Sequence, residues 1–393
     1  MTSSNSKAEL RLSSSQSVLH VITCLDVGGA ELALKRLILS DSLAASRHVV
    51  VSLCDVGSVG RDLQEAGVTV HALHMGQVLS NASVMFRLVR LIARLKPAVI
   101  QTWMYHADLL GGLAARLAGR REVIWGIRQT GFASGASTVT VGVMKLCARV
   151  SSWVTRVIVC CAEAARDSHV GCGYDDKLMR VIPNGFELPN LSNVPEWRMK
   201  LRDQLKVPRD SLVIGMVARF DPVKDHYGFI QAAKVVAQAN NDVRFILVGR
   251  GIDRANSTLL RWIRDVGLED KFVLLGERRD IDVCLAAMDV FCLSSIHEGF
   301  PNAVGEAMAM ALPCVVTDAG DAARIVGNTG WVVPTRDPKR LGNVLVEVIS
   351  LPTANRQTVG LTARQRIQNE FSMANTRKLF EQAYIDACAG RSA

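Results

Sequence analysis

Short apolar runs that alternate with longer segments of helical spacing limit the fold of this chain more than any other feature. Val18–Thr23, His48–Leu53 and Val68–Leu73 are such runs, and each contains several β-branched residues. Runs of this length are typical of parallel strands buried on both faces, with helices between them that cover the sheet. The sequence therefore predicts an α/β fold built from successive βα units.

The alternating pattern occurs in two series. The pause between them contains Ile182–Gly185, which has the composition of a turn, and Pro189–Pro195, which is rich in Pro, Asn and Ser. A chain of 393 residues has the length of two domains. We predict two doubly wound, Rossmann-like domains, residues 17–187 and 188–372, that face each other across a cleft.

The two ends of the chain are expected to lie outside these domains. Residues 1–16 are polar and Ser-rich, without an apolar run, and we expect a mobile tail there. Residues 373–393 are expected to form a C-terminal helix.

The net charge and the cysteine content indicate which binding partners and which cellular compartment to expect. The net charge of +9 would suit nucleic acid, anionic lipid or phosphate-bearing substrates. The basic residues are interspersed and no nucleic-acid motif accompanies them, so we expect no nucleic-acid partner. The ten cysteines include no CxxC pair, which predicts free thiols in a reducing cytosol. No apolar stretch of about 18 residues lacks charges, so we expect no transmembrane helix and a cytoplasmic location.

The segment His297–Glu306 carries the strongest functional signal because it follows an apolar strand and leads into a helix. Backbone N–H groups at a helix N-terminus are free to bind an anion. Glu298 stands before the helix, near enough to contact a sugar hydroxyl, and Glu306 lies about one turn further on, where it could accept hydrogen bonds from ribose hydroxyls. The alternative is that both glutamates are ordinary surface charges. The residues around the expected helix start are Gly299, Phe300, Pro301 and Asn302.

Two further clusters contain residue types that suit phosphate. Arg219 and Lys224 stand just past the apolar strand Val213–Val217, at the carboxyl end where doubly wound sheets bind ligands. An arginine fork and a lysine charge both suit a diphosphate. Gly28 and Gly29 lie between a strand and a helix, where glycine lets the backbone approach a phosphate closely. The alternatives are a charged surface loop and a simple helix-entry turn.

Three other positions carry weaker signals. His106 follows a strand and is expected at the mouth of the cleft in the first domain. Arg128 follows the strand Glu122–Trp125 and is a candidate contact for donor or acceptor. Asp280–Asp282 matches a DxD metal-binding pattern, but it precedes a helical segment, so we interpret Asp280 as a helix N-cap.

Together these motifs resemble those of the family-4 glycosyltransferases, which are retaining enzymes of GT-B fold. The strand, Glu298, the Gly-Phe-Pro-Asn sequence and Glu306 are similar to the two-glutamate signature of that family. The motifs stand in the family's order, and the resemblance extends from about Val18 to Phe380. The other matching segments are the phosphate-binding loop Gly215–Lys224, the glycine loop Gly28–Glu31 and the interdomain turn Val181–Gly185.

The resemblance implies a role for each candidate residue. Arg219 and Lys224 would bind the donor diphosphate, Glu306 its ribose, and Glu298 the transferred sugar. Gly28 and Gly29 would lie near the phosphates and His106 near the sugar. Family members take a nucleotide sugar as substrate, generally without a metal ion or other cofactor. Their C-terminal helix often crosses back to the first domain.

We therefore expect a hexosyltransferase that moves a hexose or N-acetylhexosamine from a nucleoside-diphosphate sugar to a glycan or lipid-linked acceptor, in surface polysaccharide or glycoconjugate synthesis. The Gly-Phe-Pro-Asn version of the motif resembles the members that use UDP-sugars. Two other functions stay open. One is a nucleotide-sugar epimerase of GT-B type, and the other is a catalytically silent homologue that only binds a partner.

The segment Thr138–Arg156 bears on the acceptor. It combines apolar residues at helical spacing with Lys145, Arg149 and Arg156. This pattern suits either an interfacial helix that rests on anionic lipid or a core helix with a solvated basic edge. An anionic membrane surface is therefore a candidate partner, with the enzyme peripheral on the cytoplasmic face.

Overall fold

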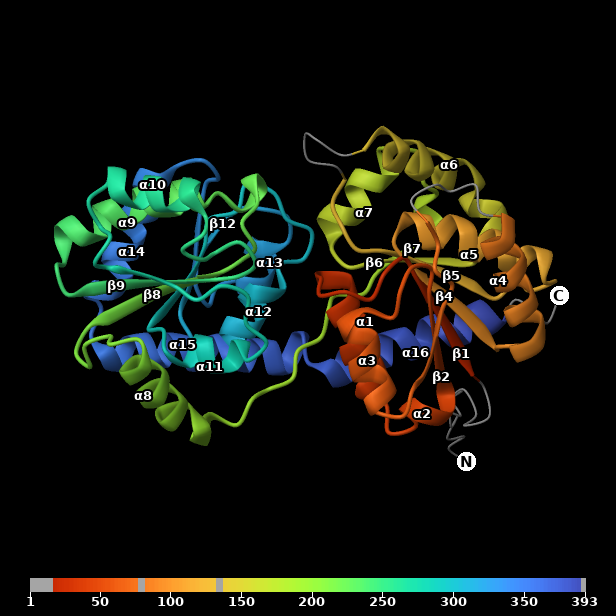
Figure 1. Cartoon of the computed structure of the whole chain (residues 1–393), viewed down its shortest axis with the longest axis horizontal. Helices are drawn as coiled ribbons and strands as arrows, with labels where there is room; N and C mark the ends of the chain where they lie inside the picture. The colour runs from red at the N-terminus through yellow and green to blue at the C-terminus, as the bar shows by residue number, and fades with distance from the viewer. Residues whose placement is uncertain (1–16, 77–81, 132–136, 390–393) are drawn as a thin grey trace, which may run out of the picture. The chain divides into compact units, whose positions relative to one another are not determined.

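The computed structural model describes residues 17–76, 82–131 and 137–389. The expected tail over residues 1–16 lies outside this part of the chain. The chain divides into two compact units. The first unit comprises Met1–Gly185 together with Met373–Ala393, and the second comprises Phe186–Ser372. Each unit is an α/β layered structure with its own sheet (Figure 1).

The first unit contains a seven-stranded parallel sheet in the order β3-β2-β1-β4-β5-β6-β7. Its strands are β1 (Val18–Ile22), β2 (His48–Ser52), β3 (Thr69–Ala72), β4 (Val99–Trp103), β5 (Val123–Ile127), β6 (Val157–Cys160) and β7 (Met179–Val181). Its helices are α1 (Gly29–Leu39), α2 (Ala44–Arg47), α3 (Gly57–Glu65), α4 (Ala82–Leu95), α5 (Tyr105–Leu117), α6 (Thr138–Val154), α7 (Glu163–Val170) and α16 (Met373–Ala389). The strand order reverses beside β1, and right-handed crossovers therefore put α1 and α3 on one face of the sheet and α4 to α7 on the other.

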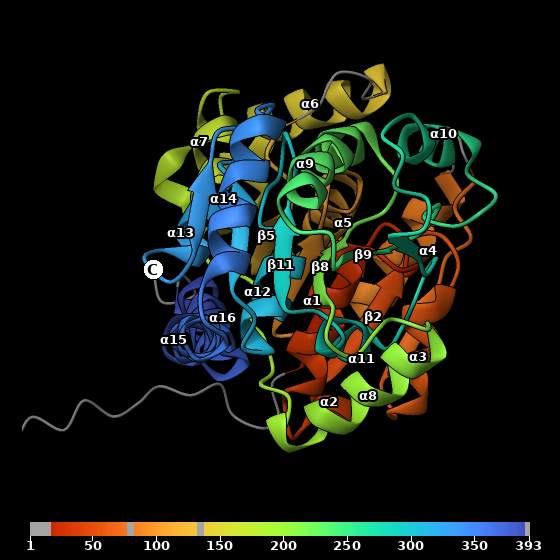
Figure 2. The same cartoon turned by 90° about the vertical axis from the view of Figure 1, so that its left-hand side faces the viewer.

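The second unit contains a six-stranded parallel sheet in the order β10-β9-β8-β11-β12-β13. Its strands are β8 (Leu212–Val217), β9 (Val243–Val248), β10 (Phe272–Leu274), β11 (Val290–Leu293), β12 (Cys314–Thr317) and β13 (Trp331–Val333). Its helices are α8 (Val194–Gln204), α9 (His226–Ala239), α10 (Ser257–Asp265), α11 (Ile281–Ala286), α12 (Asn302–Ala309), α13 (Ala322–Val326), α14 (Pro338–Ser350) and α15 (Thr353–Glu370). Helices α9 and α14 pack side by side on this unit (Figure 2).

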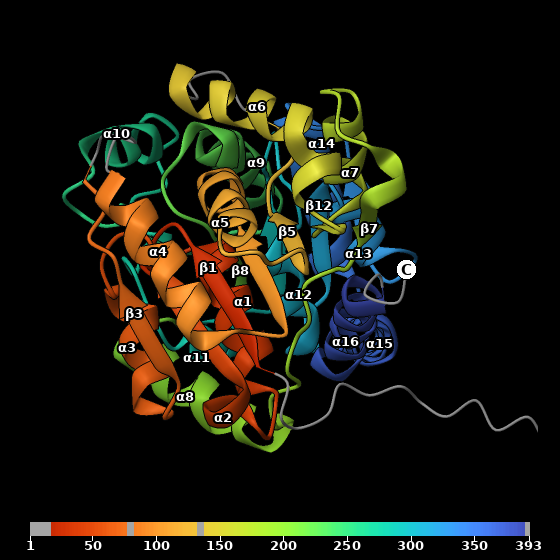
Figure 3. The same cartoon turned by 90° about the vertical axis from the view of Figure 1, so that its right-hand side faces the viewer.

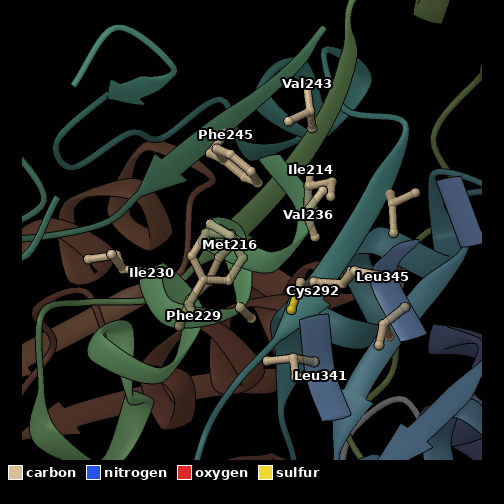
Figure 4. Close-up of a cluster of buried hydrophobic side chains, with 14 of the residues drawn as sticks. Ile214, Met216, Phe229, Ile230, Val236, Val243, Phe245, Cys292, Leu341 and Leu345 are labelled. Atoms are coloured by element: carbon tan, nitrogen blue, oxygen red, sulfur yellow. The ribbon is translucent and has the colours of Figure 1, made fainter. Parts of the chain in front are cut away.

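The core of the second unit lies between its sheet and the helices α9, α10 and α14. Figure 4 shows how Phe229 and Val236 from α9 meet strand residues such as Phe245, while Leu341 and Leu345 come from α14. All of these side chains are almost completely buried. Burying large apolar side chains of this kind contributes about 1.5–3 kcal/mol each, so the core fixes the sheet and the loops at its carboxyl edge.

Helix α16 packs on the core of the first unit. Its Phe380 and Tyr384 are buried in the same apolar cluster as the strand residues Val18 and Ile22. Arg47 also forks onto the carboxylate of Glu381, with N–O distances of 2.6 and 2.8 Å. The chain thus finishes in the unit in which it started.

The apolar runs Val243–Val248, Val290–Leu293 and Cys314–Thr317 predict strands. The structure has strands with these bounds, because a continuous apolar sequence leaves little freedom in where they end. One helix begins earlier than its pattern suggests. The sequence pattern predicts helical structure only from Thr362, but α15 begins at Thr353, directly after Pro352 at its N-cap position. Its polar sequence has no apolar stripe that would have revealed the first turns.

All ten cysteines are free thiols, as the sequence predicts. None of the helices over residues 17–76, 82–131 and 137–389 is long and apolar enough to cross a bilayer.

A buried carboxyl group, Asp108, lies in the first turn of α5. The hydroxyl of Thr102 is 2.5 Å from one of its oxygens, and the N–H of Gly126 donates to the same oxygen at 3.2 Å. Burial raises the pKa of Asp108 to about 8, in spite of these hydrogen bonds. At neutral pH the group is therefore mainly a neutral acid.

This carboxyl group predicts a stability that falls in alkali. The unfolded chain releases the Asp108 proton near pH 4, whereas the folded chain keeps it until about pH 8, so stability decreases as the pH rises through that window. When the pH rises from 6 to 9, wild type should lose about 3 kcal/mol more folding stability than Asp108→Asn. Urea unfolding at both pH values measures this, with the exposed Asp167→Asn as control. If folding stability changed with pH equally in wild type and in Asp108→Asn, the assignment of Asp108 as a buried neutral carboxyl group would be contradicted.

Candidate functional site

The sheet of the second unit reverses its strand order between β8 and β11, which lie side by side in parallel register. Ligands of doubly wound sheets bind at the carboxyl ends of strands beside such a reversal. The loops that leave these two strands are hydrogen-bonded to each other. Ser294 Oγ donates to the Lys224 carbonyl at 2.9 Å, and the Ile296 N–H donates to the Val223 carbonyl at 2.8 Å. The fold thus joins the Arg219–Lys224 cluster to the glutamate motif.

Lys224 and Glu298 form an ion pair at this edge, with 2.6 Å between Nζ and Oε1. The side chains are 17% and 9% exposed. Ser295 Oγ donates to the same carboxylate oxygen at 2.7 Å. The pair therefore places a cation and an anion in direct contact, with the lysine partly exposed and the carboxylate largely buried.

The backbone under Glu298 is fixed from β12. The hydroxyl of Thr317 donates to the Ser295 carbonyl at 2.6 Å, and the Asp321 N–H donates to the Gly299 carbonyl at 3.0 Å. Gly320 lies between these bonds in the left-handed region, with φ +57°. A Cβ atom there would be 2.4 Å from the carbonyl oxygen of Glu298, closer than real contacts allow.

Gly320→Ala should therefore damage the site, not only the fold. The control is Gly267→Ala, because Gly267 has φ +70° but open space around its Cβ position. Both variants should lose about 1 kcal/mol of stability from backbone strain. Only Gly320→Ala should lower the turnover of the reaction at this site, by about tenfold or more, because it moves Glu298. Equal turnover in the two variants, measured with thermal unfolding alongside, would show that the Glu298 loop tolerates displacement.

Arg219 lies on the same loop and is 52% exposed on its side chain. Its guanidinium donates twice to one oxygen of Asp221, at 2.8 and 3.0 Å. Burial alone would raise the pKa of Asp221, but hydrogen bonds from the Val223 N–H and from Arg219 hold that pKa below its ordinary value. Asp221 therefore stays ionised and holds the exposed arginine at the mouth of the loop.

Helix α12 begins after Pro301, which occupies the N-cap position. Proline suits the first turn of a helix, which predicts Pro301 there, but Asn302 is the first helical residue, one position later. Glu306 is half-buried one turn into the helix. Phe300 is 7% exposed and packs against Phe186 and Phe371, with ring centroids 6.1 and 6.0 Å apart. Its side chain therefore anchors the loop, and only its backbone is left for a ligand.

Sequence reasoning did not single out His226, the first residue of α9. Its ring is 2% exposed and lies 5.6 Å from the ring of Phe220. Burial lowers the pKa of His226 to about 4, and the nearby Lys224 cation acts in the same direction. The ring is therefore neutral and packs under the loop that carries Arg219 and Lys224. Its place directly after Asp225, which caps α9, is the one sequence signal that could have marked it.

The first unit has its own strand reversal, between β1 and β4. Gly28 and Gly29 follow β1 at the start of α1, and His106 follows β4 as the second residue of α5. Met104, just before α5, has φ +76°, a conformation that costs a non-glycine residue about 1–3 kcal/mol. Burial lowers the pKa of His106, so the ring is mainly neutral at pH 7. The fold thus brings the glycine loop and His106 to one edge of this sheet.

Arg128 lies just past β5 and is half-buried. Its guanidinium lies 4.2 Å from the ring centre of Trp103 and 5.5 Å from that of Phe380 in α16. One amino group donates to the side-chain oxygen of Asn184 at 3.1 Å. Burial lowers the pKa of Arg128. Its stacked position links β5, the C-terminal helix and the turn that ends the first unit.

Asp280 occupies the N-cap position of α11, as predicted, but its side chain does not cap the helix. The carboxylate instead accepts two hydrogen bonds from Arg278, at 2.8 and 2.5 Å. Across the residues that the structure describes, no group of three or more His, Cys, Asp or Glu side chains is placed to hold a metal ion.

Two doubly wound parallel sheets, each with its candidate residues at a strand reversal, are the architecture of the GT-B fold. A solved structure of HepE from Anabaena in complex with UDP and glucose shares this fold, with a TM-score of 0.82 and 22% identity over 93% of this chain and 98% of that one. The profile of Glycosyltransferase Family 4 matches residues 27–188, and that of Glycosyl transferases group 1 matches residues 211–350. The chain belongs to the family-4 glycosyltransferases.

Two curated relatives extend this comparison. The UDP-Gal:alpha-D-GlcNAc-diphosphoundecaprenol alpha-1,3-galactosyltransferase of Escherichia coli is 29% identical over 307 residues, which is 76% of this chain and 78% of that protein. The capsular polysaccharide biosynthesis glycosyltransferase CapM of Staphylococcus aureus is 24% identical over 337 residues, 81% of this chain and 85% of that protein.

Proposed function

We propose that this protein transfers a hexose or N-acetylhexosamine from a UDP-sugar to a glycan or lipid-linked acceptor, with retention of anomeric configuration. The observation that carries the proposal is the Lys224–Glu298 pair at the strand reversal of the second unit, with Arg219 on the same loop. Such a site offers cations for a diphosphate and a carboxylate for sugar hydroxyls.

The donor would bind through residues of both adjoining loops. Arg219 and Lys224 would contact the diphosphate, and backbone N–H groups at the start of α12, around Gly299 and Asn302, would bind its oxygens. Glu306 would accept hydrogen bonds from the ribose hydroxyls. HepE, which has the same fold, has been solved with UDP-glucose, which supports a uridine donor.

The residues suit a reaction in which charge builds up on the leaving diphosphate. The C1–O bond of the donor sugar breaks, the acceptor oxygen bonds to C1 on the same face, and the departing phosphate oxygen takes the acceptor proton. Lys224 and Arg219 would stabilise the negative charge on that phosphate. Glu298 would orient the sugar, so no protein nucleophile is needed. The name of the Escherichia coli relative gives UDP-Gal as the donor and an alpha-1,3 linkage as the product. An alpha product from this donor supports retention of the anomeric configuration.

The class of acceptor rests on the relatives. One relative acts on GlcNAc-diphosphoundecaprenol, and the other takes part in the biosynthesis of a capsular polysaccharide, as their names state. We propose that the acceptor here is likewise a growing surface glycan, carried on a lipid diphosphate, and that transfer takes place at the cytoplasmic face of the membrane.

A screen of donors, with and without acceptor, tests this function. The protein is incubated with UDP- and GDP-sugars alone, and then with a lipid-diphosphate-linked GlcNAc. We expect acceptor-dependent release of UDP. Conversion of the donor to its epimer without acceptor would identify an epimerase, and no nucleotide release under any condition would identify a silent homologue; either result would overturn the proposal.

The same reaction should not depend on a divalent cation, because Arg219 and Lys224 supply the positive charge that a metal ion supplies elsewhere. The rate of sugar transfer measured in about 5 mM EDTA should equal the rate measured with Mg²⁺ within about twofold. Loss of transfer in EDTA that Mg²⁺ or Mn²⁺ restores would contradict this assignment.

A further inference from the structure

The positive charge of the chain is concentrated in one segment. Residues 82–156 contain eleven Lys and Arg and two Asp and Glu, a surplus of nine. The whole chain has 46 basic and 37 acidic residues, so its remaining 35 basic and 35 acidic residues balance. Of the two carboxyl groups in the segment, Asp108 is buried and Glu122 lies 3.9 Å from Arg120. The basic residues are interspersed in sequence, but their surplus lies in one part of the fold.

This segment forms the helical layer on one face of the sheet in the first unit. Helix α5 contacts both α4 and α6, and the three helices lie on the same side (Figure 3). Most of the basic side chains point to solvent. The exposed ones are Arg87, Arg90, Arg94, Lys96, Arg121, Lys145, Arg149 and Arg156.

The outer face of α6 mixes these charges with apolar side chains. Val139, Leu146 and Trp153 recur every seven residues and are 55%, 44% and 57% exposed. Residues seven apart lie on one face of a helix. Lys145 and Arg149 lie between them. The inner face supplies the core with Val143, Met144, Cys147, Ala148 and Val154. The inner face of α6 therefore belongs to the core, and the outer face leaves basic and apolar side chains exposed.

The end of α5 adds to the same patch. The guanidinium of Arg116 lies 5.1 Å from the ring centre of Trp153, and the neighbouring Leu117 is 70% exposed. Burial lowers the pKa of Arg116, and the nearby Arg121 and Arg156 lower it further. Like charges that crowd together in this way repel each other, and an anionic partner would relieve that repulsion.

We propose that the outer face of α6, with the end of α5, docks on a bilayer that contains anionic lipid. Leu146 and Trp153 would enter the boundary between headgroups and acyl chains, and Lys145 and Arg149 would lie among the lipid phosphates. The exposed apolar side chains distinguish a bilayer from nucleic acid, which would leave them in water. A second copy of this face would bring two positive patches together, so the charge opposes self-association.

This docking goes beyond sugar transfer and does not require it. It would hold the enzyme at the surface where a lipid-linked acceptor lies. Vesicle binding is measured without donor or acceptor, so its outcome is independent of the proposed function.

The test uses co-sedimentation with vesicles of phosphatidylcholine containing phosphatidylglycerol, and with vesicles of phosphatidylcholine alone. The chain offers a matched control, because Lys145-Leu146 in α6 and Lys378-Leu379 in α16 are the same dipeptide, and both leucines are 44% exposed. Wild type should bind the anionic vesicles and release them as salt rises. Lys145→Glu/Leu146→Ser should lower the partition coefficient about tenfold or more. Lys378→Glu/Leu379→Ser should bind as wild type does.

A second variant and a spectroscopic measurement keep the result decisive. Arg149→Glu/Trp153→Ser should lose binding as well, with unchanged thermal unfolding because both side chains are exposed. Lipids brominated on their acyl chains should quench wild-type tryptophan fluorescence, and Trp153→Phe should remove that quenching. Absence of binding at low salt, equal loss in the α6 and α16 variants, or quenching that persists in Trp153→Phe would each overturn the proposal.

Discussion

Lys224→Met should lower the sugar-transfer rate by about 10²–10³-fold while leaving the chain folded. The lysine is only 17% exposed and touches Glu298 at 2.6 Å, at the carboxyl edge where the donor diphosphate is expected. Removal of its charge takes away stabilisation of the leaving phosphate. Steady-state kinetics measures the loss, with the exposed Lys339→Met as control.

The ion pair could instead serve only the fold, and a double variant separates these roles. Lys224→Met leaves a largely buried Glu298 carboxylate without its cation, which costs stability. Adding Glu298→Gln removes the unpaired charge and should restore stability. If both residues contact the donor, the double variant Lys224→Met/Glu298→Gln should be stable and still inactive. Recovery of transfer together with stability would reduce the pair to a structural role and remove Lys224 from the donor site.

Glu306→Ala should weaken the apparent affinity for the donor by about 10²-fold, because two ribose hydroxyls would lose a charged acceptor. Glu306 is half-buried on α12, and its truncation opens no large cavity. Unfolding should therefore change little. The measurement is the donor KM together with calorimetric titration of UDP. Glu347→Ala, at an exposed glutamate of α14, is the matched control.

Two outcomes would contradict the role of Glu306. An unchanged KM and an unchanged UDP affinity would exclude contact with the nucleotide. A fall in kcat without any change in UDP affinity would move the glutamate from the ribose to the reacting sugar.

The alternation of apolar runs with helical segments predicted the α/β class and most strands, because parallel strands buried on both faces admit few other residues. The site followed from one further rule, that ligands bind at carboxyl ends beside a strand reversal. That rule predicts that Arg219 and Lys224, after one strand, and Glu298, after another, lie at the carboxyl edge of the second sheet. The sequence could not show the direct Lys224–Glu298 pair, since 74 residues separate the two and only the register of β8 and β11 joins them.

Tertiary packing decided the features that sequence reasoning missed. Phe300 stands inside a ligand motif, yet its ring is buried between Phe186 and Phe371, which come from distant parts of the second unit. The stacking of Arg128 on Phe380 depends on where α16 packs. Neither contact has a local signature, because side-chain spacing along one segment carries no information about what another segment brings to it.

The helices of the first unit that carry the surplus of basic residues show a third limit of prediction from sequence. The sequence alone suggested an interfacial helix or a core helix for Thr138–Arg156. Helix α6 is buried along one side and exposes Leu146 and Trp153 on the other. A seven-residue spacing fits both faces of a helix, and the packing of α6 against α5 decides which residues are buried.

Hydrogen–deuterium exchange with and without UDP tests the central claim most directly, because it locates the nucleotide on the chain. The account predicts slower exchange in the second unit over residues 218–226 and 294–306, the two loops and the helix start beside the strand reversal. Exchange that is unchanged by saturating UDP, or protection confined to segments outside these two, would contradict the assignment of the donor site.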